Sequence, residues 1–177
     1  MPLYGGGMEN YMEAVVQSMV ASLDAVLPKE IVVFLISMIP LLELRGSILA
    51  AGIMGMEWVP TMIIAVLGNM LPIPFILYFI KAIFNWMKKF NGLKKIPEFC
   101  ERKAMKHSGQ IEKYGVFGLF LFVAIPLPGT GAWTGSLLAV LFGLKPKKSL
   151  LFIFFGVVTA GFIMSVLGFG VLKNLIY

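Results

Sequence analysis

Two charged residues, Glu43 and Arg45, lie two positions apart in a long apolar stretch. From Ile31 to Ile80 the only other side chain charged at neutral pH is Glu57. A charge inside a membrane costs at least about 2.5 to 3.5 kcal/mol, so it normally lines a cavity and serves a function. Arg45 could bind an anionic headgroup in a bidentate manner, and Glu43 could exchange a proton or bind a coupling cation. Alternatively, the two charges neutralise each other and hold a loop.

The second candidate segment is a break rich in proline and glycine. It lies in the uncharged stretch Gly115–Leu144. Glycines let backbone amides approach a ligand closely, and the start of the following half-helix presents free amides to an anion. Thr130, Trp133 and Thr134 add hydroxyl groups and an aromatic wall, although a plain kinked turn would explain the same residues. Asn69, inside another apolar run, is either a helix contact or an ion-coupling residue.

The candidate site therefore has two parts. The predicted substrate-binding residues are Pro40, Arg45, Pro126, Pro128, Gly129, Thr130, Gly131, Trp133 and Thr134. The predicted ion-coupling residues are Glu43 and Asn69.

The composition indicates the environment in which these residues work. The mean hydropathy is +0.90 and only 14% of the residues are charged, against roughly a quarter in an average soluble domain. An integral membrane protein without a soluble catalytic domain follows. No histidine lies in the apolar runs to activate Ser47 or Ser136, and no nucleotide-binding motif is present. We expect neither an enzyme nor a cofactor, and the lone Cys100 argues against a cysteine-based metal site.

The distribution of basic residues predicts the orientation. Nine of the fifteen Lys and Arg residues fall between Lys81 and Lys113, beside apolar runs. This pattern is typical of a cytoplasmic loop near anionic lipid, not of a nucleic-acid partner. We therefore expect a multi-pass protein of the inner (plasma) membrane with residues 81–114 and 145–148 in the cytoplasm. Aromatic residues around Lys88 and Lys89 fit a helix along the inner leaflet, whereas Lys94–Lys113 reads as a solvated loop.

The expected fold class is all-α integral membrane. Residues 1–28 form a leader and an amphipathic interfacial helix, 29–80 a first repeat, 81–114 the basic loop and 115–177 a second repeat. Val59–Ile80 and Ser149–Leu172 are long enough to span, with a kink expected in the first at Pro72 and Pro74. The run Ile31–Leu42 is about 18 Å long as a helix, too short for a core of about 30 Å.

An internal repeat connects the two breaks. Ile39-Pro40-Leu41 matches Ile125-Pro126-Leu127, and Gly46–Ala50 matches Gly135–Ala139. If each broken segment is a re-entrant hairpin, both flanks of the second are basic and cytoplasmic, while both flanks of the first are outside. The second half is then inverted relative to the first, as in many secondary transporters. Four ordinary spans with proline kinks are the alternative.

These two motifs also carry a family resemblance. Pro40–Gly46 together with Pro126–Gly135 resembles the small multidrug-export family, which looks like a compact relative of the DedA membrane proteins. The resemblance implies two opposed re-entrant hairpins and ion-driven lipid translocation, with Glu43 and Arg45 at the acidic and basic positions of the first motif. DedA-type members carry arginines on the second hairpin, where this chain has Pro-Gly-Thr-Gly.

The sequence thus predicts a secondary transporter or flippase. Its substrate would be an amphipathic anion such as polyprenyl phosphate, coupled to a proton or sodium gradient. A multidrug exporter of lipophilic cations and a non-transporting scaffold that shapes the bilayer are the alternatives. The expected partners are membrane lipids, the coupling H+ or Na+ and a second copy of the chain, because a homodimer would shield turned backbone that lipid cannot hydrogen-bond.

Overall fold

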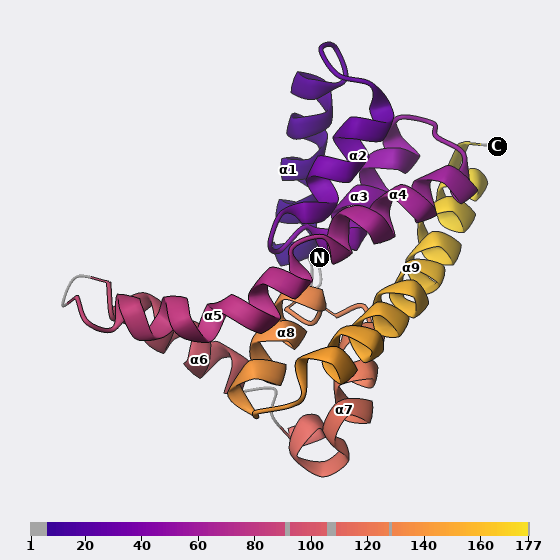
Figure 1. Ribbon diagram of the computed structural model, residues 1–177. Helices are drawn as coiled ribbons and strands as arrows, with labels where there is room; N and C mark the ends of the chain where they lie inside the picture. The colour runs from indigo at the N-terminus through magenta and orange to yellow at the C-terminus, as the bar shows by residue number, and fades with distance from the viewer. Residues whose placement is uncertain (1–6, 91–92, 106–108, 128, 177) are drawn as a thin grey trace. The chain divides into compact units, whose positions relative to one another are not determined.

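The computed structural model describes residues 7–90, 93–105, 109–127 and 129–176, and in this part of the chain all regular structure is helical (Figure 1). The helices are α1 (Gly7–Leu23), α2 (Lys29–Met38), α3 (Glu43–Ile53), α4 (Trp58–Met70), α5 (Ile73–Met87), α6 (Lys95–Met105), α7 (Gly109–Ala124), α8 (Ala132–Leu141) and α9 (Pro146–Ile176). They belong to two compact units, which are described separately.

Within the residues that the structure describes, two segments are long and apolar enough to cross a membrane. They are Trp58–Met87, with 30 residues and a mean hydropathy of 2.2, and Pro146–Val166, with 21 residues and a mean hydropathy of 2.3. At 1.5 Å per residue, each exceeds the hydrocarbon thickness of about 30 Å. The first is interrupted at Leu71 and Pro72, between α4 and α5, where the prolines predicted a kink. The all-helical class is therefore confirmed, with two candidate membrane-spanning segments in the described part of the chain.

Unit one comprises Met1–Leu71, Pro126–Gly129 and Val158–Tyr177. Within it α2, α3 and α4 pack on one another, and α1 packs on α3 (Figure 1). The helical pattern predicted for α1 is confirmed, since Val16 and Val20 are buried while Gln17 and Ser18 are exposed. Whether α1 lies in the membrane interface stays a prediction.

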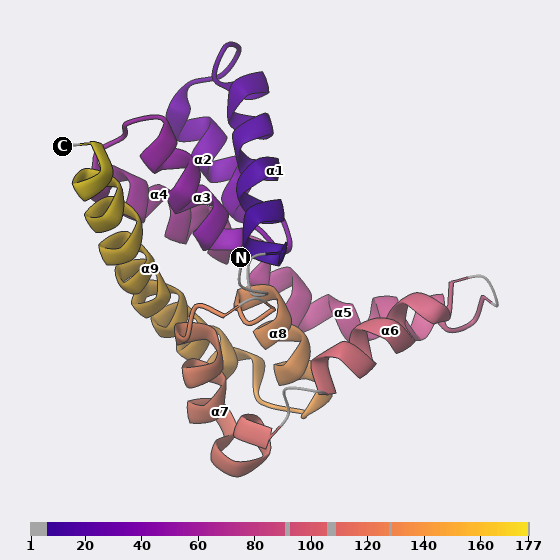
Figure 2. The same ribbon diagram turned by 180° about the vertical axis from the view of Figure 1, so that it is seen from behind.

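Unit two comprises Pro72–Ile125 and Thr130–Val157. Its centre is α8, which contacts α5, α6 and α7 (Figure 2). The expectation of a solvated loop over Lys94–Lys113 is wrong, because Lys95–Met105 forms α6. The prediction was based on the many charged residues and did not consider three apolar residues at helical spacing, namely Leu93, Ile96 and Phe99.

The same helix–turn–helix pattern occurs once in each unit. Gly46 is the fourth residue of α3, and a Cβ there would lie 2.8 Å from Leu42 Cβ. Gly135 is the fourth residue of α8, and a Cβ there would lie 2.7 Å from Val123 Cγ2. At Gly135 the missing Cβ lets α8 approach Val123 of the preceding helix α7, whereas at Gly46 it relieves crowding against Leu42, the N-cap residue of α3 itself. The serine that follows each glycine is buried and donates to a backbone carbonyl within its own helix.

The correspondence continues into the long helix of each unit. A Cβ at Gly68 of α4 would lie 2.7 Å from the carbonyl oxygen of Phe34, and one at Gly156 of α9 would lie 3.1 Å from the carbonyl oxygen of Phe120. Phe34 and Phe120 each lie five residues before the matched Ile-Pro-Leu of the repeat. The internal repeat therefore covers a helical hairpin plus the start of a long helix. The inverted and re-entrant arrangement stays a prediction.

Candidate functional site

The first break separates α2 from α3 and has an unusual backbone. Leu41 has φ of 83° and Glu43 has φ of 48°. These left-handed values cost a non-glycine residue roughly 1 to 2 kcal/mol each, so surrounding contacts must hold them. Glu43 is only 8% exposed, whereas Leu41 is 74% exposed and Pro40 is also exposed. The break thus turns a carboxylate inward while its proline faces outward.

The two outer ends of this hairpin lie together. Lys29, at the start of α2, donates from Nζ to the carbonyl oxygen of Met54, just after α3, at 2.6 Å. The helices α2 and α3, with 10 and 11 residues, are each about 15 to 17 Å long at 1.5 Å per residue. Each is therefore about half the thickness of a membrane core.

Arg45 connects the two sequence motifs. Its side chain is half-buried, and Nη1 donates to the carbonyl oxygen of Leu127, 82 positions further along the chain. Glu43 interacts electrostatically with the same guanidinium. Unit one thus brings together the charged pair of the first break and the backbone of the second break.

The remaining residues of the second break have separate surroundings. Pro126 and Gly129 are half-buried in unit one, and Gly129 has φ of 86°, which favours glycine. Thr130 belongs to unit two and donates from Oγ1 to the carbonyl oxygen of Ile125 at 2.7 Å, which closes the turn. Gly131 is the N-cap of α8. Three further predicted residues are Trp133 and Thr134, both half-buried on α8, and Pro128, which lies outside the described residues.

Asn69 lies in α4 of unit one and is 1% exposed. Its Oδ1 has no hydrogen-bond partner within the described part of the chain. A buried acceptor without a partner costs roughly 1 to 3 kcal/mol, so its presence needs an explanation. In the second repeat the position that corresponds to Asn69 is the residue after Gly156, which is Val157. Val157 is equally buried but has no polar side chain.

The two repeats differ in the same way at the charged pair. Counting from the first residue of the second hairpin helix, Glu43 corresponds to Ala132 and Arg45 corresponds to Thr134. Unit two therefore builds the same hairpin without a charge at either position. Among the matched positions of the described repeat, the charged pair and the buried amide are therefore found in unit one alone.

The sequence did not reveal two features of unit one. The acceptor for Arg45 is the backbone carbonyl of Leu127, and no residue type signals a backbone acceptor. Ser165 of α9 is 4% exposed and its Oγ has no hydrogen-bond partner among the described residues. A serine among small residues in a long helix gives no signal that distinguishes it from a packing residue.

These features define a helical protein with apolar segments of membrane-spanning length and a charged pair in the break of a short helical hairpin in unit one. Residues 43–163 match the family described as "Putative small multi-drug export protein", and the chain belongs to that family. Neither a curated protein nor a solved structure matches the chain. The family match begins at Glu43 and thus includes the charged pair. Together with the two apolar segments, it assigns the chain to the membrane as a protein of exporter type.

Proposed function

We propose that the protein is an ion-coupled secondary transporter of an amphipathic anion, with a phosphorylated lipid such as a polyprenyl phosphate as substrate. Arg45 binds the headgroup while the lipid tail stays in the bilayer. The observation that carries the proposal is the bond from Arg45 to the Leu127 carbonyl, beside a buried Glu43. This bond connects the cation of the first break to the backbone of the second break.

An anionic headgroup can compete for this bond. The carbonyl of Leu127 is a neutral acceptor, so its bond to Arg45 is charged on the donor only, whereas a phosphate group adds charge on the acceptor and can accept two parallel hydrogen bonds. A phosphate oxygen can therefore replace the carbonyl at the planar fork of Arg45. The exchange releases the connection between α3 and the second break, so that binding of substrate favours a different arrangement of these segments.

Glu43 supplies the coupling in this mechanism. When ionised, it offsets the charge of Arg45 and disfavours an anion. When a proton or a nearby Na+ neutralises Glu43, the charge of the Arg45 guanidinium is no longer compensated and can bind the anionic headgroup. Because linkage is reciprocal, the ion and the anion strengthen each other's binding by the same factor. Asn69 offers a buried carbonyl oxygen, a ligand type that suits a hard cation, and its unpartnered Oδ1 supports this role.

The proposed topology places both hairpins as re-entrant segments in the inner membrane. Each hairpin helix is too short to cross, and the pattern recurs before each long helix. Opposite insertion of the two would give the inverted repeat of a secondary transporter, related to the DedA membrane proteins as the resemblance implies. Residues 81–114 and 145–148 then lie in the cytoplasm.

The second candidate function is export of lipophilic cations, which the family description favours. In that mechanism the ionised Glu43 binds the substrate's charge and Arg45 tunes the carboxylate. The two functions predict opposite pH dependence, because protonation of Glu43 strengthens the binding of an anion and weakens the binding of a cation.

The deciding experiment measures binding of a short-chain prenyl phosphate and of a lipophilic quaternary ammonium compound in detergent at several pH values. Anion transport predicts that prenyl phosphate binds more tightly as pH falls, and that Glu43→Gln, a mimic of the protonated state, binds it tightly at every pH. Asp24→Asn is the matched control, since Asp24 is an exposed carboxylate in the same unit, and it should behave as wild type. Tighter ammonium binding at high pH, abolished by Glu43→Gln, would favour cation export instead.

A further inference from the structure

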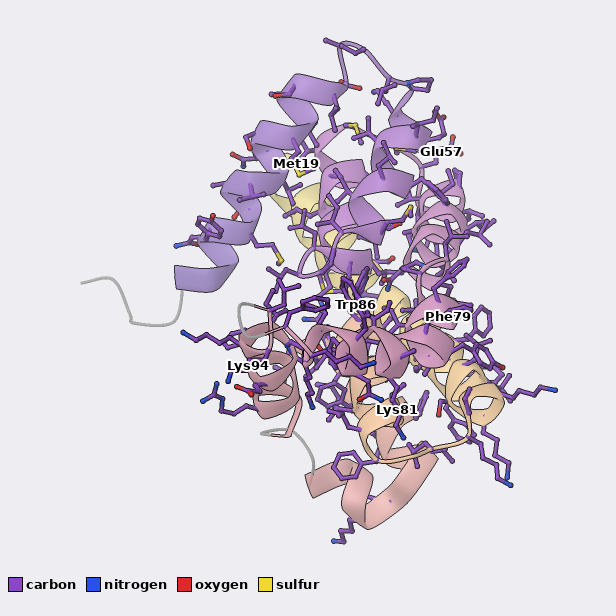
Figure 3. All side chains as sticks on the ribbon, turned by 60° about the vertical axis from the view of Figure 1, so that its left-hand side comes forward. Met19, Glu57, Phe79, Lys81, Trp86 and Lys94 are labelled. Carbon is purple, nitrogen blue, oxygen red and sulfur yellow. The ribbon has the colours of Figure 1, made fainter. Side chains whose placement is uncertain are left out.

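The end of α5, the connection after it and α6 form a surface that the transport mechanism does not use. Its apolar part is a row of exposed side chains. They are Phe79, Ile83, Trp86, Phe90, Leu93, Ile96 and Phe99. Figure 3 shows Phe79, Lys81 and Trp86 on α5 and Lys94 just before α6.

The apolar side chains form two helical stripes. On α5 they recur at intervals of three or four residues, and the helix turns its other side inward through Ile73, Leu77 and Phe84. On α6 the stripe continues with Ile96 and Phe99. An exposed apolar stripe along a helix with a charged face is typical of a helix that lies in the membrane interface.

Basic residues accompany these stripes. Residues 81–105 contain seven Lys or Arg and two Glu. Those whose side chains are described as exposed are Lys81, Lys88, Lys89, Lys94, Lys95 and Arg102. Such a cluster beside a membrane attracts anionic lipid, with each basic residue contributing a factor of about five in binding.

From this arrangement we infer that the α5–α6 surface, made of the exposed residues within 79–90 and 93–102, binds the anionic phospholipid headgroups of the leaflet on which it lies. A bilayer fits better than an acidic protein for two reasons. The α5 stripe continues directly from the apolar segment Trp58–Met87, so Trp86 enters the interface from the lipid side. Trp86 also stacks edge-on with Phe90 at 5.0 Å between ring centroids, an aromatic pair of the kind that anchors proteins at headgroup depth.

The test uses quenching of tryptophan fluorescence by brominated lipids in vesicles that contain the full chain. Trp58→Phe with Trp133→Phe leaves Trp86 as the only tryptophan, and Trp86→Phe with Trp133→Phe leaves Trp58 as a matched probe beside the acidic Glu57. Brominated phosphatidylglycerol and brominated phosphatidylcholine are compared at the same mole fraction. We expect a preference for phosphatidylglycerol of about fivefold or more at Trp86 and no preference at Trp58.

Neutralising charge provides the second arm. Replacing Lys89, Lys94 and Lys95 by Gln should lower the preference at Trp86 severalfold, and about 1 M salt, at which the screening length is only about 3 Å, should bring it close to one. Replacing Lys145, Lys147 and Lys148 by Gln removes the same charge elsewhere and should leave the preference unchanged. Equal quenching of Trp86 by the two lipids would overturn the inference. So would a preference that the first triple substitution leaves unchanged, and absence of quenching by either lipid would overturn it in favour of a protein partner.

Discussion

Substituting Gly68→Ala tests the close approach of α4 to α2 in unit one. The added Cβ would lie 2.0 Å from Ser37 Oγ and 2.7 Å from the carbonyl oxygen of Phe34. The serine hydroxyl can rotate, although it would lose its 2.6 Å bond to the same carbonyl. The carbonyl belongs to the backbone of α2 and cannot rotate away. An ordinary contact of about 3.4 Å therefore requires the two helices to separate locally by about 0.7 Å, the difference between 3.4 and 2.7 Å.

Two effects of opposite sign decide the outcome of this substitution. Alanine is better than glycine inside a helix by about 1 kcal/mol. Overpacking a tight contact costs about 1 to 3 kcal/mol, and here the obstructing atom is rigid. We expect a net loss of about 1 to 2 kcal/mol in the free energy of unfolding. Gly156→Ala should act in the same direction, because its Cβ would lie 2.7 Å from Val123 Cβ and 3.1 Å from the Phe120 carbonyl oxygen.

The assay is unfolding in detergent micelles followed by tryptophan fluorescence. Leu67→Ala is the control, because Leu67 precedes Gly68 in α4 and is 60% exposed, and its stability should change little. Adding Ser37→Ala to Gly68→Ala should restore only part of the loss, since the carbonyl of Phe34 remains. A Gly68→Ala variant as stable as wild type, or more stable, would refute the close approach.

Three further predictions concern function and assembly. Asn69→Val, which copies the equally buried Val157, should fold with unchanged or higher stability but lose the ion dependence of transport in proteoliposomes; retained ion dependence would remove Asn69 from the coupling site. Cysteines placed at Glu30 and Glu57 in a Cys100→Ser background should react with an impermeant reagent from the same side of the membrane, and reaction from opposite sides would rule out the re-entrant hairpin. Mass photometry in mild detergent should find a homodimer, whereas a stable monomer would contradict the shielding argument.

Much of the fold could be predicted from the distribution of charge and proline. Long uncharged runs define the two spanning segments, and proline at 72 and 74 predicts the interruption after α4. The hairpins follow from runs too short to cross and from the glycine–serine matches. The helix α6 was not predicted, because the high content of charged residues in this segment indicated a loop, and only three apolar residues indicated a helix.

The candidate site was predictable only in part. Glu43 and Arg45 could be predicted, because placing charges in an apolar stretch carries an unfavourable insertion free energy that a functional role would explain. The Leu127 carbonyl could not be predicted as the acceptor for Arg45, because every residue has a backbone carbonyl and only the folded structure shows which one lies within reach. Asn69 is recognised as unusual because the corresponding residue, Val157, is apolar and equally buried. That correspondence is visible only in the structure, where the preceding Gly68 and Gly156 make equivalent helix contacts.

The most direct test of anion binding at Arg45 is mass spectrometry of the native lipids that co-purify with wild type, Arg45→Ala and the control Lys145→Ala. The control removes an exposed basic residue outside the described site. We expect that a lipid with a phosphate monoester headgroup is enriched on wild type and on Lys145→Ala and is lost from Arg45→Ala. Equal enrichment of such a lipid on all three proteins, or on none of them, would contradict this expectation.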